Sequence, residues 1–270
     1  MAAQVSTSSN RPCNFGLPPS DGAEGRASIL QTYLERATGR PVVVSVCRNY
    51  SELSRDVLSG KLDACWAPPF ACARLEKMGA RVLLRDVRRG ASTYRAVLLG
   101  RVETGLTLDK LAGKVAAWTD KGSVAGYMLP MAFLRARGLE PQTMFSAQKF
   151  LGTYRAALEE VVASRADVTS IFAPSAASGG APTSGLDELA PEWRRSLAPV
   201  AVTDECPNDG VVTSASATAD VVTALERALL ELAATSAGSR VAADVFHIDR
   251  FERPEPGAYG SLYKLALASV

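Results

Sequence analysis

The sequence predicts an α/β protein with largely parallel sheets, divided into two lobes. Short apolar segments alternate with amphipathic helical patterns along the chain, and this alternation is typical of βαβ units. With 270 residues, 47% of them hydrophobic, the chain is long enough for two lobes of ordinary domain size. Its 30 basic and 28 acidic residues form no basic stripe, which gives little support to a nucleic-acid-binding surface.

Seven segments are expected to form strands, because each is a short run rich in Val, Leu and Ala bounded by Gly, Pro or charge. They are 40–47, 62–66, 80–87, 94–100, 114–118, 166–172 and 197–203. Apolar residues at helical spacing predict helices, among them 27–39, 154–164, 220–234 and 261–270. The stretch 173–185 is rich in small residues and is expected to be a mobile loop.

Two stretches of the chain resemble each other. Residues 50–63 (YSELSRDVLSGKLD) and 154–167 (YRAALEEVVASRAD) both begin with Tyr, carry an apolar pair at matching places and reach Asp thirteen residues later. The similarity extends upstream to 20–39 and 119–138, which each open with an acidic residue and glycine and end a helix at Gly. The chain is therefore expected to contain two similar βαβ lobes, the alternative being a chance similarity of amphipathic helices.

Two such lobes place a cleft between the carboxyl ends of their strands, where ligands bind in α/β sheets. Tyr50 and Tyr154 each open a helix and are expected to face each other across this cleft. The loops 18–22 and 119–123 are expected to face it from equivalent places.

The loop TDKGSVAGYMLP, residues 119–130, follows an apolar strand and leads into a helix. Its residues Gly122, Ser123 and Gly126 allow backbone N–H groups and a hydroxyl to gather at the helix start, where negative charge is favoured. The loop is therefore a candidate anion site, and the alternative is an ordinary strand-to-helix turn.

Three motifs occur in a specific order: NYSELSRDVLSGKLDACWAPP, then YRAVL, then GSVAGYMLP. Together, over about Phe15 to Val212, they resemble the PhnD-like phosphonate-binding group of type 2 periplasmic binding proteins, the solute receptors of ABC transporters. The resemblance implies a two-lobed fold, with 1–98 and 206–270 as lobe one and 99–205 as an inserted lobe two. It also implies hinges near 98–101 and 203–206, closure around a small ligand, and a transporter permease as partner.

The chain departs from the family's pattern at the anion loop. Phosphonate binders carry consecutive hydroxyl residues ahead of the glycine, whereas here Ser123 is followed by Val124 and Ala125. The histidine that such binders use in lobe two has no counterpart, because Thr153 and Tyr154 stand there. The N–H groups of 123–126 still fit an anionic oxygen, and Arg155 is expected to add charge as a fixed fork.

Aromatic residues stand at the ends of several predicted strands and helices. These are Tyr50, Trp66, Tyr94, Trp118 and Tyr154. An aromatic box suits a cationic or planar ligand, and the alternative for each ring is packing in the core.

Asp120 and Asp209 are the acidic candidates for the site, with a helix cap and a turn as their respective alternatives. A site that contains these acids and Arg155 suits a ligand that is small, polar, and anionic or zwitterionic. His247 is interpreted as structural, and 88–90 (RRG) as a solvated turn.

A second hypothesis is a cytosolic enzyme with the same fold, acting on a small polar metabolite. No catalytic motif stands out, so whether the chain is an enzyme stays open, with Asp120, Asp209 or a Cys65 thiolate as candidate bases. The third hypothesis is a sensor that passes ligand-driven closure to a protein partner. No metal or cofactor is expected under any of the three.

The start of the sequence carries no cationic region and no apolar run, so a cytoplasmic location is expected for the sequence as written, or a periplasmic one if an export signal was removed. A monomer without membrane insertion is expected. Five cysteines without CxxC spacing predict free, mostly buried thiols rather than a disulfide framework or a zinc site.

Overall fold

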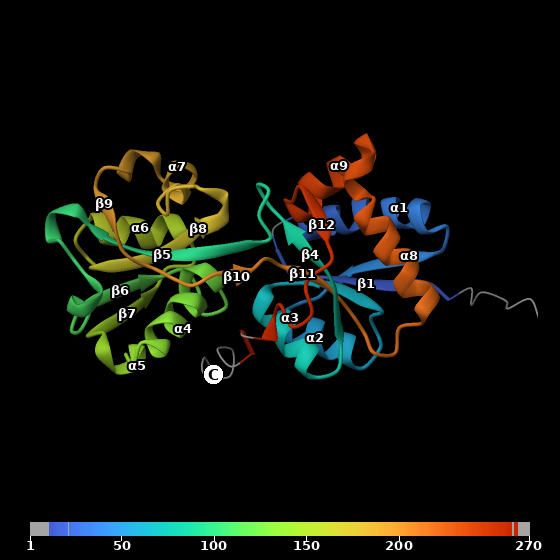
Figure 1. The fold of residues 1–270 in the computed structure, drawn as a ribbon, viewed down its shortest axis with the longest axis horizontal. Coiled ribbons are helices and arrows are strands. Elements are labelled where there is room, and N and C mark those ends of the chain that lie inside the picture. The colour runs from blue at the N-terminus through green and yellow to red at the C-terminus, as the bar shows by residue number, and fades with distance from the viewer. Residues whose placement is uncertain (1–10, 21, 261, 264–270) are drawn as a thin grey trace, which may run out of the picture. The chain divides into compact units, whose positions relative to one another are not determined.

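The structure is a computed structural model, and it describes residues 11–20, 22–260 and 262–263. The chain forms two compact units: unit 1 comprises 1–88 and 209–256, and unit 2 comprises 89–208 and 257–270 (Figure 1). The division expected from the sequence, at 98/99 and 205/206, stays a prediction. The expected helix at 261–270 lies almost wholly outside the described residues.

Unit 1 contains a six-stranded sheet in the order β12-β4-β11-β3-β1-β2. The strands are β1 (Cys13–Leu17), β2 (Val42–Val46), β3 (Ala64–Ala67), β4 (Arg81–Val87), β11 (Gly210–Thr213) and β12 (Arg250–Glu252). β1 pairs in parallel with β2 and β3, and the other pairings are antiparallel. The helices are α1 (Ala23–Thr38), α2 (Tyr50–Leu58), α3 (Pro69–Lys77), α8 (Ala219–Leu230) and α9 (Ser236–Val241).

Unit 2 contains a second sheet in the order β10-β5-β8-β6-β7, with β9 also paired to β5. The strands are β5 (Thr93–Arg101), β6 (Val115–Trp118), β7 (Ala147–Phe150), β8 (Val168–Pro174), β9 (Leu197–Val202) and β10 (Cys206–Pro207). The helices are α4 (Leu129–Ala136), α5 (Pro141–Met144), α6 (Tyr154–Val162) and α7 (Gly185–Leu189). All seven strands predicted from sequence are confirmed, and so is the α/β class. The expectation of largely parallel sheets is wrong: both sheets are mixed, because the strands outside the β1 and β6 groups pair antiparallel.

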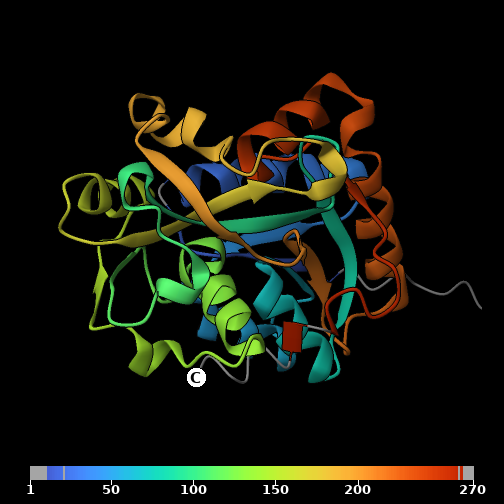
Figure 2. The ribbon, with the colours of Figure 1, turned by 60° about the vertical axis from the view of Figure 1, so that its left-hand side comes forward.

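The sheet of unit 2 is buried on both faces. Figures 1 and 2 show α6 on one face and α4 on the other. Along β5, Val97 and Leu99 join the core under α6, whereas Leu98 between them joins the core under α4. Because both faces are covered, this strand reads as a continuous apolar run rather than an alternating one.

The internal repeat is confirmed by the sheet topology. In unit 1 the strand β1 pairs in parallel with β2 on one side and β3 on the other, and in unit 2 β6 does the same with β7 and β8. α2 and α6 occupy equivalent places between strands, start at Tyr50 and Tyr154, and span nine residues each. Both begin after a side-chain cap, from Asn49 and Thr153.

The aspartates that end the repeated stretches have the same structural role. The Asp63 carboxylate accepts the backbone N–H of Asn14 at 2.8 Å, and the Asp167 carboxylate accepts that of Val115 at 2.9 Å. The backbone N–H of each aspartate donates in return to the carbonyl of the same strand residue, at 2.8 Å in both cases. Each aspartate therefore fixes the start of the strand that has two parallel neighbours, β1 in unit 1 and β6 in unit 2. Arg11 also pairs with Asp63.

Replacing Asp63 by Ala is expected to lower the free energy of unfolding by about 1.5–3 kcal/mol, the range for a hydrogen bond to a charged group. Asp167→Ala is expected to have a smaller effect, because that side chain is 28% exposed and Asp63 only 1%. Urea denaturation measures both. Asp204→Ala, at an 81% exposed side chain, is the control and should change stability by less than about 0.5 kcal/mol. Equal effects at Asp63 and Asp204 would contradict the assigned role.

Candidate functional site

The loop that follows β6 makes a tight turn before its helix. An Asp120 carboxylate oxygen accepts the backbone N–H of Gly122 at 2.7 Å, and the Ser123 N–H donates to the Asp120 carbonyl at 3.0 Å. This local hydrogen bonding turns the chain back on itself within three residues. Asp120 therefore shapes the turn, and its side chain is exposed. The alternative interpretation of Asp120 as the helix cap is wrong, because Ser123 caps this helix.

The helix after this turn begins with one π-helical turn, Val124–Met128, which continues into α4. Its first bond runs from the Met128 N–H to the Ser123 carbonyl at 2.9 Å, one residue longer than in an α-helix. The N–H groups just ahead of Met128 therefore have no acceptor within the turn, and the Gly126 N–H instead donates to Ser123 Oγ at 3.2 Å. Such a start is chemically suited to an anion.

Position 126 requires glycine, because the helix start leaves no room for a Cβ atom there. A Cβ atom at Gly126 would lie 2.1 Å from Thr119 Oγ1 and 2.7 Å from Ser123 Oγ. Thr119 is buried, and its hydroxyl has no hydrogen-bond partner among the described residues. The backbone of the helix start thus lies directly against two hydroxyl groups.

Tyr154 joins this cluster from α6. Burial raises the pKa of its phenol, and a hydrogen bond with the Ser123 side chain opposes that increase. Its ring packs edge-on against Phe172, with centroids 6.0 Å apart. The structure therefore brings together Ser123, Gly126 and Tyr154, three of the residues predicted for the site.

Arg155, the expected charged fork, points to a different partner. Its guanidinium forms an ion pair with Glu192, donates to the Leu189 carbonyl at 3.2 Å and lies 5.0 Å from the centroid of the Trp193 ring. These contacts hold the side chain against the segment after α7. A role for Arg155 in ligand binding stays a prediction, and it would require the guanidinium to leave this pair.

In unit 1 the predicted residues Trp66 and Asp209 are connected through Asp86 and the partly buried Arg88. Trp66 Nε1 donates to Asp86 at 3.1 Å, and Arg88 donates to Asp86 at 2.9 Å and to Asp209 at 2.7 Å. The Arg88 guanidinium also lies 6.0 Å from the centroid of the Trp66 ring. The interpretation of 88–90 as a solvated turn is wrong for Arg88, because two carboxylates hold its side chain.

Asp86 is the fully buried acid of this cluster. Its burial raises the pKa of the carboxyl, and the Arg88 guanidinium opposes the increase. Asp86 and Arg88 were not among the site residues predicted from the sequence. The available signal was an acid and a base two residues apart at the end of an otherwise apolar strand, which places both on one face.

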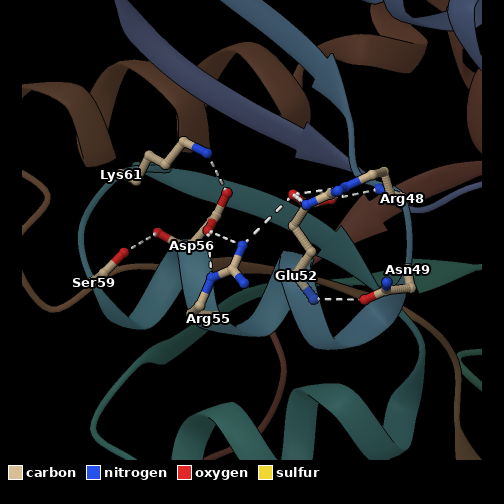
Figure 3. Close-up of polar contacts among 7 residues, drawn as sticks. All are labelled: Arg48, Asn49, Glu52, Arg55, Asp56, Ser59 and Lys61. Atoms are coloured by element: carbon tan, nitrogen blue, oxygen red, sulfur yellow. Dashed lines mark hydrogen bonds and ion pairs between the residues drawn. The ribbon is translucent and has the colours of Figure 1, made fainter.

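Tyr50 opens α2 and is 45% exposed, so its ring is accessible to a ligand. Figure 3 shows how this helix start is held. The Asn49 side chain accepts the Glu52 N–H at 2.8 Å, and Glu52 accepts the Arg48 backbone N–H at 2.7 Å and its guanidinium at 2.9 Å. Tyr94 lies in β5, opposite Cys206 of β10 and Pro174 of β8.

A family model for the periplasmic phosphonate substrate-binding proteins of ABC transporters matches residues 18–259. The chain belongs to this family. It is therefore a small-molecule receptor of the ABC transporter type, in a family of periplasmic proteins. None of the helices in the described part of the chain is long and apolar enough to cross a membrane.

Solved structures share the fold over most of the chain at low sequence identity. XAC2383 from Xanthomonas citri was solved bound to chloride and bound to ATP. Each structure superposes with a TM-score of 0.79 and 18% sequence identity over 95% of this chain. The match covers 96% of the chloride-bound chain and 97% of the ATP-bound chain. PhnD1 from Prochlorococcus marinus, in complex with methylphosphonate, superposes with a TM-score of 0.72 and 16% sequence identity, over 97% of this chain and 100% of that chain. A binding protein component of an ABC phosphonate transporter from Pseudomonas aeruginosa superposes with a TM-score of 0.70 and 17% sequence identity, over 96% of this chain and 87% of that chain.

The cysteines and acids were also considered as metal ligands or bases. All five cysteines are free and buried, as predicted. Burial raises the pKa of Cys13 to about 12 and that of Cys47 to about 11, and it raises the pKa of Cys65 as well, which keeps the Cys65 candidate base a thiol at neutral pH. Across the described residues, no three His, Cys, Asp or Glu side chains gather where they could hold a metal ion.

Gly126→Ala is expected to destabilise the protein by about 1–3 kcal/mol, because the added Cβ must displace Thr119 or Ser123. Thermal or urea unfolding measures the change. The matched control is Gly25→Ala in α1, where a Cβ meets open space. That substitution is expected to be neutral or to stabilise by about 0.5–1 kcal/mol, since Ala is the better helix former. If Gly126→Ala matched the control, the close approach would be wrong.

The hydrogen bonds from Arg48 lower the pKa of Glu52 to about 2, from an ordinary value of 4.5. Arg48→Ala is expected to raise this pKa toward 4.5, which NMR titration of the carboxyl carbon measures. Because the folded-state pKa is lowered, the stability that this pair adds is present above about pH 4.5 and is lost as the pH falls to about 2. The stability difference between wild type and Arg48→Ala should shrink over that interval. An unchanged Glu52 pKa in the variant contradicts the assignment.

Proposed function

We propose that this receptor binds a small solute through a phosphonate or phosphate group, and that the loop 119–126 holds the anion. The observation that carries the proposal is the π-helical start, where unpaired N–H groups gather beside Ser123. Family membership supports it. Three of the similar structures contain methylphosphonate, ATP or chloride, and each of these ligands is an anion.

Within the loop, the backbone N–H groups of Val124 and Ala125 are the donors proposed for the anionic oxygens. Ser123 adds a hydroxyl, and its hydrogen bond with Tyr154 sets the direction of that hydroxyl. Gly126 is proposed to contribute by letting the backbone approach closely. The other expected ligand contacts stay predictions: Asp120, Tyr94 and Arg155 in unit 2, and Tyr50, Trp66 and Asp209 in unit 1.

The proposal extends to the transport step. The expected partner is an ABC transporter permease, and the expected receptor is a monomer that closes its two units on the ligand. Small-angle X-ray scattering with and without ligand measures closure and mass together. The cytoplasmic location expected for the sequence as written also stays a prediction, which fractionation of cells expressing the native gene would test.

Ligand screening by thermal unfolding tests the function directly. Methylphosphonate, inorganic phosphate, nucleotides, betaines and amino acids are the probes. A true ligand at about 100 times its dissociation constant stabilises the fold by about 2.7 kcal/mol, which appears as a rise in melting temperature. If no phosphonate or phosphate compound raised the melting temperature, the proposed function would be wrong.

For any probe that binds, calorimetry on Ser123→Ala is expected to show a loss of about 0.5–1.5 kcal/mol, or up to about 3 if the hydroxyl contacts a charged oxygen. Trp66→Ala is expected to lose more, because it removes a large apolar surface. Ser146→Ala, at an exposed residue before β7, is the control and should bind like wild type. Unchanged affinity in Ser123→Ala would make the loop a simple turn.

A further inference from the structure

A lysine lies beside the proposed anion loop and takes no part in the interactions described above. Lys121 is exposed and stands two residues before Ser123. Its ammonium lies 5.5 Å from the centroid of the Phe150 ring. Among the described residues, no carboxylate lies within ion-pair distance of this ammonium.

Phe150 is itself an unusual residue. It ends β7, directly opposite Trp118 at the end of β6, and it is 40% exposed. Its ring packs edge-on against Tyr127 of the π-helical turn, with centroids 5.1 Å apart. The ring is thus fixed at the strand ends, and the exposed ammonium of Lys121 lies over it.

The other charged groups near this loop are already engaged. Arg155 is paired with Glu192, and Lys149 donates to Glu160 at 2.8 Å and to the Arg165 carbonyl at 2.9 Å. The Asp120 carboxylate is directed to the Gly122 N–H. Lys121 is therefore the cation in this part of the described structure that an incoming anion can recruit without breaking an ion pair.

We propose that Lys121 is the counter-ion of the ligand's phosphonate or phosphate group, and that Phe150 holds it in position. The inference rests on the proposed function and assigns to Lys121 the role expected of Arg155 and of the missing loop hydroxyls. An ammonium is a compact point charge with three donors, which suits a tetrahedral oxyanion. The cation–π contact is weak at an exposed site, so the ammonium transfers readily to a dianion.

A second observation supports an anion position at this loop. The buried Thr119 hydroxyl has no partner in the described structure and lies against the helix start at Gly126. Thr119 directly follows β6, at the point where the turn to Lys121 begins. A polar group left unsatisfied in a folded protein often marks a binding position.

Calorimetry with methylphosphonate and with inorganic phosphate tests the proposal on wild type, Lys121→Met, Lys121→Arg and Phe150→Leu. Lys121→Met is expected to weaken binding about 10-fold or more, and Lys121→Arg to recover part of the loss. Phe150→Leu is expected to weaken binding about 2- to 5-fold, because the ammonium loses its support. Lys110→Met, at an exposed lysine of the same unit, is the control and should bind like wild type.

Affinity measured at a series of salt concentrations separates the electrostatic contribution of Lys121 from its steric contribution. The affinity of wild type should fall as the salt concentration rises, and that of Lys121→Met should fall less steeply. If wild type binds and Lys121→Met binds equally well with the same salt dependence, the proposal is overturned while the proposed function stands. If wild type binds neither these two probes nor any other phosphonate or phosphate, the proposed function fails, and the role of Lys121 fails with it.

Discussion

The constraint on which the parallel part of each sheet depends is the position of the strand between two parallel neighbours, β1 in unit 1 and β6 in unit 2. An aspartate from a distant part of the repeat binds the start of that strand through both its carboxylate and its backbone, at Asn14 of β1 and Val115 of β6. The strand then runs beside the edge strand of its sheet and has a parallel neighbour on each side. Because the register is set at one end, the residues at the other end are placed reproducibly.

The consequences of this constraint are clearest at the end of β6. There the chain leaves the sheet at Thr119, turns within three residues and starts a helix under tight steric limits. The π-helical start increases the number of N–H groups without an acceptor within the turn. The hydrogen bond that Ser170 Oγ donates to the Ala125 carbonyl, at 2.8 Å, fixes the position of this turn. A preorganised set of donors of this kind avoids the entropy loss of ordering a loop on binding.

Much of this architecture could be predicted from the sequence, because the interactions that specify it are local and repeated. Tyr followed by Asp thirteen residues later marked both helices and the strands after them. The sequence did not reveal β1, because CNFGL is short and is interrupted by Asn and Gly. That strand is stabilised by neighbours on both sides, so its own propensity decides little.

The side-chain directions at the site were much harder to predict. The sequence placed Arg155 next to Tyr154, but it does not show that Glu192 and Trp193, almost forty residues away, take up the guanidinium. Likewise Arg88 was assigned to a solvated turn, although two carboxylates from different strand ends hold it. Such pairings depend on tertiary contacts, which one-dimensional patterns do not encode.

Arg88 of unit 1 and Lys121 of unit 2 have different neighbours, and this difference determines which of the two is available to an anionic ligand. In unit 1, Arg88 is neutralised by Asp86 and Asp209, and the same cluster holds the Trp66 indole N–H. Its charge is balanced within the protein by these two carboxylates. In unit 2, the described neighbours of Lys121 offer an aromatic ring in place of a carboxylate. A carboxylate at that place would compete with an anionic ligand for the ammonium, whereas a ring holds the ammonium without cancelling its charge.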